Sequence, residues 1–522
     1  MKINKNILFI LSVSIALLQF AFISFILMKR IGAFGCFDDC HNFATGYFML
    51  KGRQIYSEIF YNHQMIMPFI SYLIQLITSP DSLYSLVQYH RIFVTGFSFI
   101  ATLGLILRFK WRGIIFSLLY EPIKFYFLGD RFLPEAFIPY FIAYLVGIVW
   151  ESLERKKLTR SDAVVAGFIT WLIVFLREPY VPVALLLFGF LVIKNITSIT
   201  SRLSVFIFAI LSILTLLMIP VSDYVFTVGT VNQQTVLAHE TESTDLWGSG
   251  IISILFYPFT ALFQSPTTIN GKLLFGLSSV YIFLFFWNVV KKQNRVFIVI
   301  TFLALALAAI RYVPSEAMFY EAFHMLPWLG LFIMTVSILT YNTVNSYQGR
   351  KRYIAPIILL CIWLFSIGYP KSFIYEDIST LEEFSDGYAH YQRNGDVIKK
   401  LSHPDDTVFV ELWDDIIYWQ TGLDSAYQYG LYTPLMESFP RYTTARDEMF
   451  AHDPPDFYYC SDGYIYKSDQ LIPEKYTNDY QELLENNEPS CIFVHINKIS
   501  EISDEQWKSV EALGFNLVQM EK

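Results

Sequence analysis

Hydrophobic residues run in long blocks through the first 369 residues of the chain, and short polar connections separate the blocks. Most blocks have about the 17–25 residues that an α-helix needs to cross the hydrocarbon core of a bilayer. The pattern therefore predicts a polytopic α-helical protein with about eleven membrane-spanning helices. They are expected at residues 7–28, 88–107, 113–128, 134–150, 161–177, 180–193, 203–222, 273–290, 296–312, 324–343 and 353–369.

From Pro370 onward the pattern changes to that of an ordinary soluble protein. Short strand-like runs alternate with helical or turn-rich stretches, and they lie at Thr407–Leu412, Asp456–Cys460, Cys491–Ile496 and Asn516–Met520. Such alternation is typical of a small α/β domain. We therefore expect two domains, a membrane domain at 1–369 and a soluble domain at 370–522.

Composition supports the membrane interpretation. Hydrophobic residues make up 54% of the chain and charged residues 16%, and the mean hydropathy is +0.41. A soluble protein carries charge on about a quarter of its residues. No basic patch or aromatic stacking module is present, so we expect no nucleic-acid partner.

Basic residues predict the orientation in the membrane, because cytoplasmic loops are enriched in Lys and Arg. Placing most of the basic clusters in the cytoplasm gives one consistent path with a cytoplasmic N-terminus, in a plasma membrane. Loop 29–87 and the C-terminal domain are then extracytoplasmic. The clusters that set this path are Arg108/Lys110/Arg112, Arg155/Lys156/Lys157/Arg160, Lys194/Arg202, Lys291/Lys292/Arg295 and Arg350/Lys351/Arg352.

Two carboxylates follow the first hydrophobic block directly, Asp38 and Asp39. Acids so close to a span are costly unless they face water or a ligand, which makes them candidates for chemistry. An Asp before a helix also serves as an N-cap. The residues alone leave both interpretations open.

The wider stretch at 37–68 reads FDDCHNFATGYFMLKGRQIYSEIFYNHQMIMP. An acid pair, Gly52 fourteen residues after Asp38, then Tyr56, His63 and Pro68 resembles the first extracytoplasmic loop of GT-C glycosyltransferases. These polyprenyl-phosphate-sugar-dependent enzymes include protein O-mannosyltransferases and the lipid A aminoarabinose transferase. The segments GDRFLPEAF and YEAFHMLPWL resemble the second loop of the family and the approach to a late span.

The resemblance implies a GT-C-like enzyme, an inverting hexosyl- or pentosyltransferase. Its donor is a polyprenyl-phosphate sugar, and its acceptor a lipid, glycan or protein. Asp38 is then expected to act as general base on the acceptor. Asp39 orients the helix that follows, Glu135 is a supporting acid, and Tyr56 and His63 contact substrate.

Cations are also needed, because the leaving phosphate is an anion. Arg131, Arg177 and Arg311 lie at the extracytoplasmic ends of predicted spans, where such an anion is expected. Each has an alternative role as a cation that reaches the membrane interface. The histidines His41 and His63 could join the acids in holding a divalent ion, and no resident cofactor is otherwise indicated.

Two alternatives belong to other functional classes. A transporter or flippase for a lipid-linked sugar usually has ionisable residues or broken helices at mid-membrane, whereas here the charges gather at span ends. A membrane receptor would leave the acids of the first loop unexplained. Cysteine pairs Cys36/Cys40 and Cys460/Cys491 form disulfides if they are outside the cytosol, or otherwise remain thiols.

Overall fold

The structure is a computed structural model that divides into two compact units. Unit 1 comprises Met1–Ile31, Arg91–Thr215 and Glu240–Asp377, and unit 2 comprises Gly32–His90, Leu216–His239 and Ile378–Lys522. Unit 2 therefore joins the first long loop to the C-terminal part of the chain. The residues described are 5–29, 38–155, 158–234, 269–291, 294–308, 322–346, 349–368, 380–411, 414–460 and 472–517.

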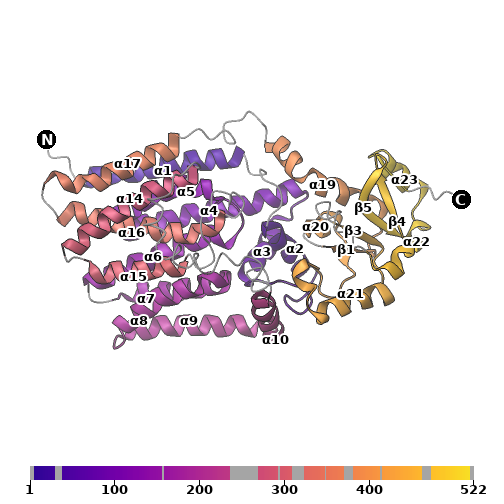
Figure 1. Ribbon diagram of the computed structural model, residues 1–522, viewed down its shortest axis with the longest axis horizontal. Helices are drawn as coiled ribbons and strands as arrows, with labels where there is room; N and C mark the ends of the chain where they lie inside the picture. Colours follow the sequence, from indigo (N-terminus) through magenta and orange to yellow (C-terminus); the bar gives the residue numbers. More distant parts are fainter. Residues whose placement is uncertain are drawn as a thin grey trace. The chain divides into compact units, whose positions relative to one another are not determined.

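Apolar helices build unit 1, and each of the eleven predicted segments overlaps a helix over most of its described residues (Figure 1). Two of these helices continue into unit 2, since α4 begins there and α9 ends there. The helices are α1 (Lys5–Lys29), α4 (Leu83–Phe109), α5 (Trp111–Lys124), α6 (Pro134–Arg155), α7 (Arg160–Leu176), α8 (Val181–Lys194), α9 (Ile199–Leu217), α14 (Ile269–Val290), α15 (Arg295–Ala308), α16 (Leu326–Ser346) and α17 (Ile354–Gly368).

Seven helices in the described part of the chain are long and apolar enough to cross a membrane: α1, α4, α6, α9, α14, α16 and α17. The remaining four, α5, α7, α8 and α15, have 14–17 residues each. The predicted polytopic α-helical fold is confirmed, with seven helices meeting the length and composition of a crossing.

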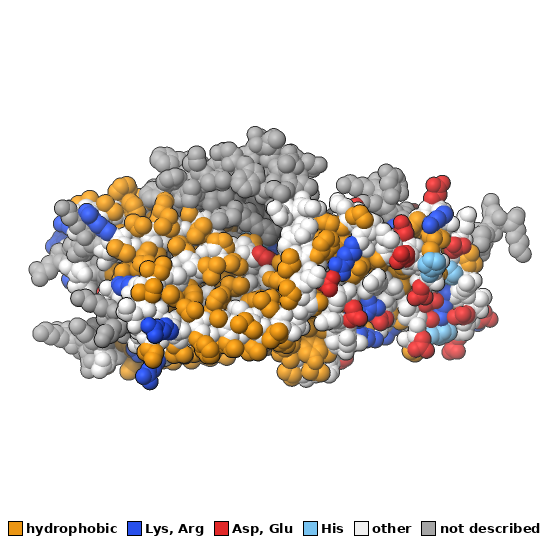
Figure 2. Space-filling model, turned by 90° about the horizontal axis from the view of Figure 1, so that it is seen from below, with side chains coloured by type: hydrophobic (Ala, Val, Ile, Leu, Met, Phe, Trp, Pro, Cys, Tyr) orange, Lys and Arg blue, Asp and Glu red, His pale blue; other side chains and the backbone are white. Residues whose placement is uncertain are grey.

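Helix α16 is central to unit 1, because it is almost entirely buried and packs against α5, α6, α14 and α15. By contrast, α1, α9 and α17 expose most of their apolar side chains. Figure 2, which views the molecule from below, shows the part of this hydrophobic surface to which α9 belongs, and few charged side chains appear on it. Exposed apolar area on this scale marks a surface that lipid or another apolar partner covers.

Unit 2 combines helices, most of them short, with one mixed sheet. The helices are α2 (Asp38–Leu50), α3 (Ile66–Thr78), α10 (Val221–Tyr224), α19 (Thr380–Leu401), α20 (Ile416–Thr421), α21 (Pro440–His452), α22 (Ile496–Ile499) and α23 (Asp504–Glu511), with a π-helix at Val225–Val231. Single 3₁₀ turns occur in both units, at Phe125–Phe127, Glu178–Tyr180, Ala322–Met325, Arg350–Tyr353, Pro434–Met436 and Glu474–Asp479.

The sheet has six strands in the order β2-β1-β3-β5-β4-β6. Strand β1 pairs in parallel with β2 and β3, and the other pairings are antiparallel. The four predicted strands are confirmed as β1, β3, β5 and β6, while β2 and β4 were not predicted. The strands are β1 (Thr407–Glu411), β2 (Asp424–Ser425), β3 (Phe457–Cys460), β4 (Tyr480–Glu485), β5 (Glu488–His495) and β6 (Phe515–Leu517).

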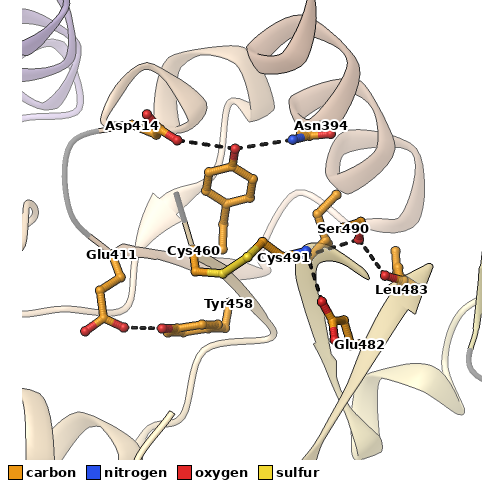
Figure 3. Close-up of a disulfide and its surroundings, with 11 residues drawn as sticks. Asn394, Glu411, Asp414, Tyr458, Cys460, Glu482, Leu483, Ser490 and Cys491 are labelled. Atoms are coloured by element: carbon orange, nitrogen blue, oxygen red, sulfur yellow. Dashed lines mark hydrogen bonds between the residues drawn. A yellow bond between two sulfur atoms is a disulfide. The ribbon is translucent and has the colours of Figure 1, made fainter. Parts of the chain in front are cut away.

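A disulfide between Cys460 and Cys491 joins neighbouring strands β3 and β5 (Figure 3). Of the two options that the sequence left open for this pair, the structure has the disulfide; Cys36, of the other pair, lies outside the described residues. Beside it, the Tyr458 hydroxyl donates a hydrogen bond to Glu411 (Figure 3). Burial raises the pKa of Glu411 although the Arg446 guanidinium opposes this shift.

Candidate functional site

The acid pair of the first loop opens helix α2, and its two members have different environments. Asp38 is exposed at the first helical position, whereas Asp39 is fully buried. Gly52, with φ +90°, follows the end of the helix in a conformation that glycine adopts without strain. Because Asp38 is exposed and Asp39 is buried, Asp38 is the member of the pair that a molecule from solvent can reach.

One turn along α2, His41 is paired with the C-terminal domain. Its Nδ1 donates to Asp415 Oδ2 at 2.6 Å, and the two side chains are 13% and 2% exposed. A carboxylate only accepts hydrogen bonds, so the pairing places the imidazole proton on Nδ1. The His41 ring stacks on Tyr61, whose hydroxyl donates to Asn42 Oδ1 at 2.6 Å.

Further contacts hold α2 and the loop after it against the C-terminal domain within unit 2. The Tyr47 hydroxyl donates to the Leu423 carbonyl at 3.1 Å, and burial, with help from the charge of Asp424, raises the pKa of Tyr47. Arg53 donates to the Ser425 carbonyl at 2.6 Å and lies 2.9 Å from Asp424. The first loop and the C-terminal domain thus form one hydrogen-bonded structure.

Tyr56 and His63, both expected to contact substrate, are linked to each other. Tyr56 is buried and has a φ of 74°, which is unusual for a residue with a side chain. Its hydroxyl donates to the His63 carbonyl at 2.8 Å, and its ring packs against Tyr224. Because its hydroxyl is hydrogen-bonded within the loop, Tyr56 holds the backbone at His63 in place.

Unit 1 contains a separate buried polar cluster around Glu135, in the first turn of α6. Glu135 Oε1 accepts a hydrogen bond from the Tyr180 hydroxyl at 3.2 Å and lies 3.6 Å from Arg177 Nε and 3.3 Å from His324 Nδ1. All four side chains are at most 10% exposed. An acid at a helix N-terminus also complements the helix dipole.

The structure thus brings together Glu135 and Arg177, which were predicted separately. Sequence reasoning missed His324 and Tyr180 as their partners. The sequence signal that could have found them is their position, since each is the first residue of a predicted span on the same predicted side as Glu135. Arg131 is buried in the turn before α6, and Arg311 lies outside the described residues.

A second buried ion pair occurs at the end of α5. Lys124 Nζ lies 2.6 Å from Glu121 Oε2, and the hydroxyls of Tyr140 and Thr102 donate to Glu121 Oε1 at 2.8 and 2.7 Å. All four residues are at most 3% exposed. Buried ionisable groups in a membrane domain are costly, and this pair is neutralised internally.

Among the described residues, the structure gives no ligand set for the divalent ion that the sequence suggested near His41 and His63. Over the residues described, no group of three or more His, Cys, Asp or Glu side chains could hold a metal ion. His41 instead has a carboxylate as its hydrogen-bond partner.

Comparisons with known proteins place this fold. No protein-family model and no curated protein sequence matches the chain. ArnT from Cupriavidus metallidurans bound to undecaprenyl phosphate aligns over 94% of this chain and 98% of its own, with a TM-score of 0.53 and 9% identity. The chain has a GT-C-like fold.

Two further structures are similar. The apo state of the same ArnT covers 93% of this chain and 97% of its own, with a TM-score of 0.52 and 9% identity. The apo oligosaccharyltransferase of Archaeoglobus fulgidus covers 93% of this chain and 74% of its own, with a TM-score of 0.50 and 12% identity. The predicted resemblance is confirmed at the level of the fold.

Proposed function

We propose that this protein is a membrane glycosyltransferase that takes a sugar from a polyprenyl-phosphate donor. The observation that carries the proposal is the similarity to ArnT over 98% of the ArnT chain, membrane and C-terminal parts together. That ArnT was solved with undecaprenyl phosphate. The extensive apolar surface of unit 1 suits an enzyme whose donor reaches it through the bilayer.

Asp38 is the proposed general base. In the reaction, an acceptor hydroxyl attacks the anomeric carbon, the bond from that carbon to the phosphate oxygen breaks, and the hydroxyl proton goes to the base. Attack from the face opposite the phosphate inverts the configuration. Asp38 is exposed and can meet an acceptor, whereas Asp39 is fully buried and suits a structural role in α2.

Cationic side chains are proposed to stabilise the departing phosphate. Arg131, Arg177 and Arg311 are the candidates, because guanidinium groups bind phosphate with paired hydrogen bonds. In the structure Arg177 already pairs with Glu135, whose negative charge offsets its own. We therefore assign Glu135 to holding Arg177 and His324 in place, and Arg131 is the sharper test of phosphate binding.

The site is proposed to be extracytoplasmic. The first loop and the C-terminal domain belong to one compact unit, which supports placing both on one side of the membrane. The Cys460–Cys491 disulfide favours the side outside the cytosol, where disulfides persist. The acceptor is then an extracytoplasmic lipid, glycan or protein.

A flippase for a lipid-linked sugar is the second candidate, and the buried Glu121–Lys124 pair is the observation that favours it. Ionisable residues inside a membrane domain often mark a path for polar substrate. The two functions differ in the fate of the donor. A transferase releases free polyprenyl phosphate, whereas a flippase moves the donor across the bilayer unchanged.

The test uses the full-length protein in proteoliposomes with undecaprenyl-phosphate sugars carrying a radioactive label in the sugar. Mass spectrometry of surface glycans and lipids from cells with and without the gene identifies the acceptor to add. Acceptor-dependent transfer of label with release of undecaprenyl phosphate supports the transferase. Movement of intact donor without cleavage would overturn it in favour of the flippase.

A further inference from the structure

A groove lies between α14 and α15 in unit 1. Both helices pack against the central helix α16 but make little contact with each other. The cavity left between them has a volume of about 490 Å³. Phe285 and Val289 of α14 and Ile298, Val299 and Phe302 of α15 form its walls.

The groove is apolar along its walls and has a charge at one end. Arg295, the first residue of α15, also lines it, and Lys291 lies directly after α14. Both are exposed. The turn between α14 and α15 belongs to one of the basic clusters that predict the cytoplasmic side. An apolar slot with Arg295 at its predicted cytoplasmic end, and Lys291 four positions earlier in the chain, suits a lipid with a chain in the slot and an anionic head group at Arg295.

We propose that this groove binds an anionic phospholipid of the cytoplasmic leaflet, with one acyl chain between α14 and α15 and the phosphate at Arg295 and Lys291. The apolar walls alone give no preference for this lipid, because all bilayer chains are equally apolar. Selectivity comes from the head group, since basic pockets between membrane helices attract anionic lipids. The inference is independent of the proposed reaction.

The experiment places the full-length protein in nanodiscs of equal parts dioleoyl phosphatidylglycerol and dioleoyl phosphatidylcholine. Native mass spectrometry of the released protein then measures which lipid stays bound. The variants are Arg295→Gln, which removes the head-group charge, and Val299→Trp, which fills the groove. The matched control is Arg202→Gln, which removes an exposed cation from the predicted cytoplasmic end of α9, away from the groove.

Wild type and Arg202→Gln are expected to retain phosphatidylglycerol in preference to phosphatidylcholine. Arg295→Gln should reduce that preference about fivefold, the effect of removing roughly 1 kcal/mol of attraction per basic residue. Val299→Trp should reduce retention of both lipids. Equal loss in Arg295→Gln and Arg202→Gln, or unchanged retention in Val299→Trp, overturns the proposal.

Discussion

His41 Nδ1 and Asp415 Oδ2 lie 2.6 Å apart, although 374 residues separate them along the chain. The pair connects α2 of the first loop to the start of α20 in the C-terminal domain. The remaining polar atoms, His41 Nε2 and Asp415 Oδ1, are buried and make no hydrogen bond to the residues that the structure describes. Among those residues, the bond between His41 and Asp415 is therefore the side-chain hydrogen bond of both.

Removing either partner of this pair should destabilise the protein. We expect His41→Phe and Asp415→Leu each to cost about 1–3 kcal/mol, because each leaves a buried polar group without its partner. The double variant should lose less than the sum, with a coupling of roughly 0.5–3 kcal/mol. Thermal unfolding of the purified protein measures this, with exposed His452→Phe as control. If the stability cost of the double variant equals the sum of the two single costs, His41 and Asp415 do not interact directly.

Asp38 and Asp39 should respond differently to the same substitution. Asp38→Asn is expected to lower turnover roughly 10²–10⁴-fold with little change in melting temperature, because it removes a base from an exposed position. Asp39→Asn should mainly lower stability, because Asp39 is fully buried. Turnover per folded molecule and melting temperature are measured together. A folded Asp38→Asn enzyme with normal turnover rules out the catalytic assignment.

Arg131 should affect binding of the donor. If Arg131 contacts the phosphate, Arg131→Gln removes a charge-assisted hydrogen bond of about 1.5–3 kcal/mol and raises the donor KM roughly 10–100-fold. Arg131→Lys should recover part of the affinity, since the charge is retained. Steady-state kinetics at varied donor concentration give the values, with Arg160→Gln at the start of α7 as control. Equal KM values for all three variants would place the phosphate site elsewhere.

The Cys460–Cys491 disulfide should stabilise the C-terminal domain. It closes a loop with a sequence separation of 31, for which loop entropy gives about 3–4 kcal/mol. Cys460→Ser and Cys491→Ser are expected to lower the melting temperature equally, and the double variant no further. Wild type treated with a reductant should match them. An unchanged melting temperature in the double variant argues that the bond is not formed in the native protein.

The orientation in the membrane is tested by labelling. Cysteines introduced for exposed Glu58 in the first loop and Ser500 in the C-terminal domain should both react with a membrane-impermeant maleimide on intact cells. A cysteine introduced for Lys291, on the predicted cytoplasmic side, should react only after lysis. Labelling of Glu58→Cys without Ser500→Cys would be incompatible with one compact unit 2.

The helices of this fold were predictable because a continuous apolar run of bilayer length is a local signal. Strands β1 and β3 were predictable for a similar reason, as each is a short run of buried residues. Strand β4, with the sequence YQELLE, was missed because polar residues occupy much of it, and β2 has only two residues.

The candidate site was predictable only in part. Sequence spacing pointed to Asp38 and Asp39 together, but it could not show that one is exposed and the other buried. Glu135 and Arg177 were placed on the same predicted side by charge alone, and their contact depends on how α6 and α7 pack. The pairing of His41 with Asp415 had no sequence signal, because nothing local links residues 374 positions apart.

Unit 2 is built from three separate segments of the chain, so it can be completed only late in synthesis. Its three segments, Gly32–His90, Leu216–His239 and Ile378–Lys522, emerge from the ribosome at different times. At about 5–20 residues per second, extending the chain by the 374 positions from His41 to Asp415 takes roughly 20–75 seconds. Helix α2 therefore waits through the insertion of most of the membrane helices before its partner exists. A nascent chain stalled before residue 415 should leave the first loop open to proteases, and release of the stall should protect it.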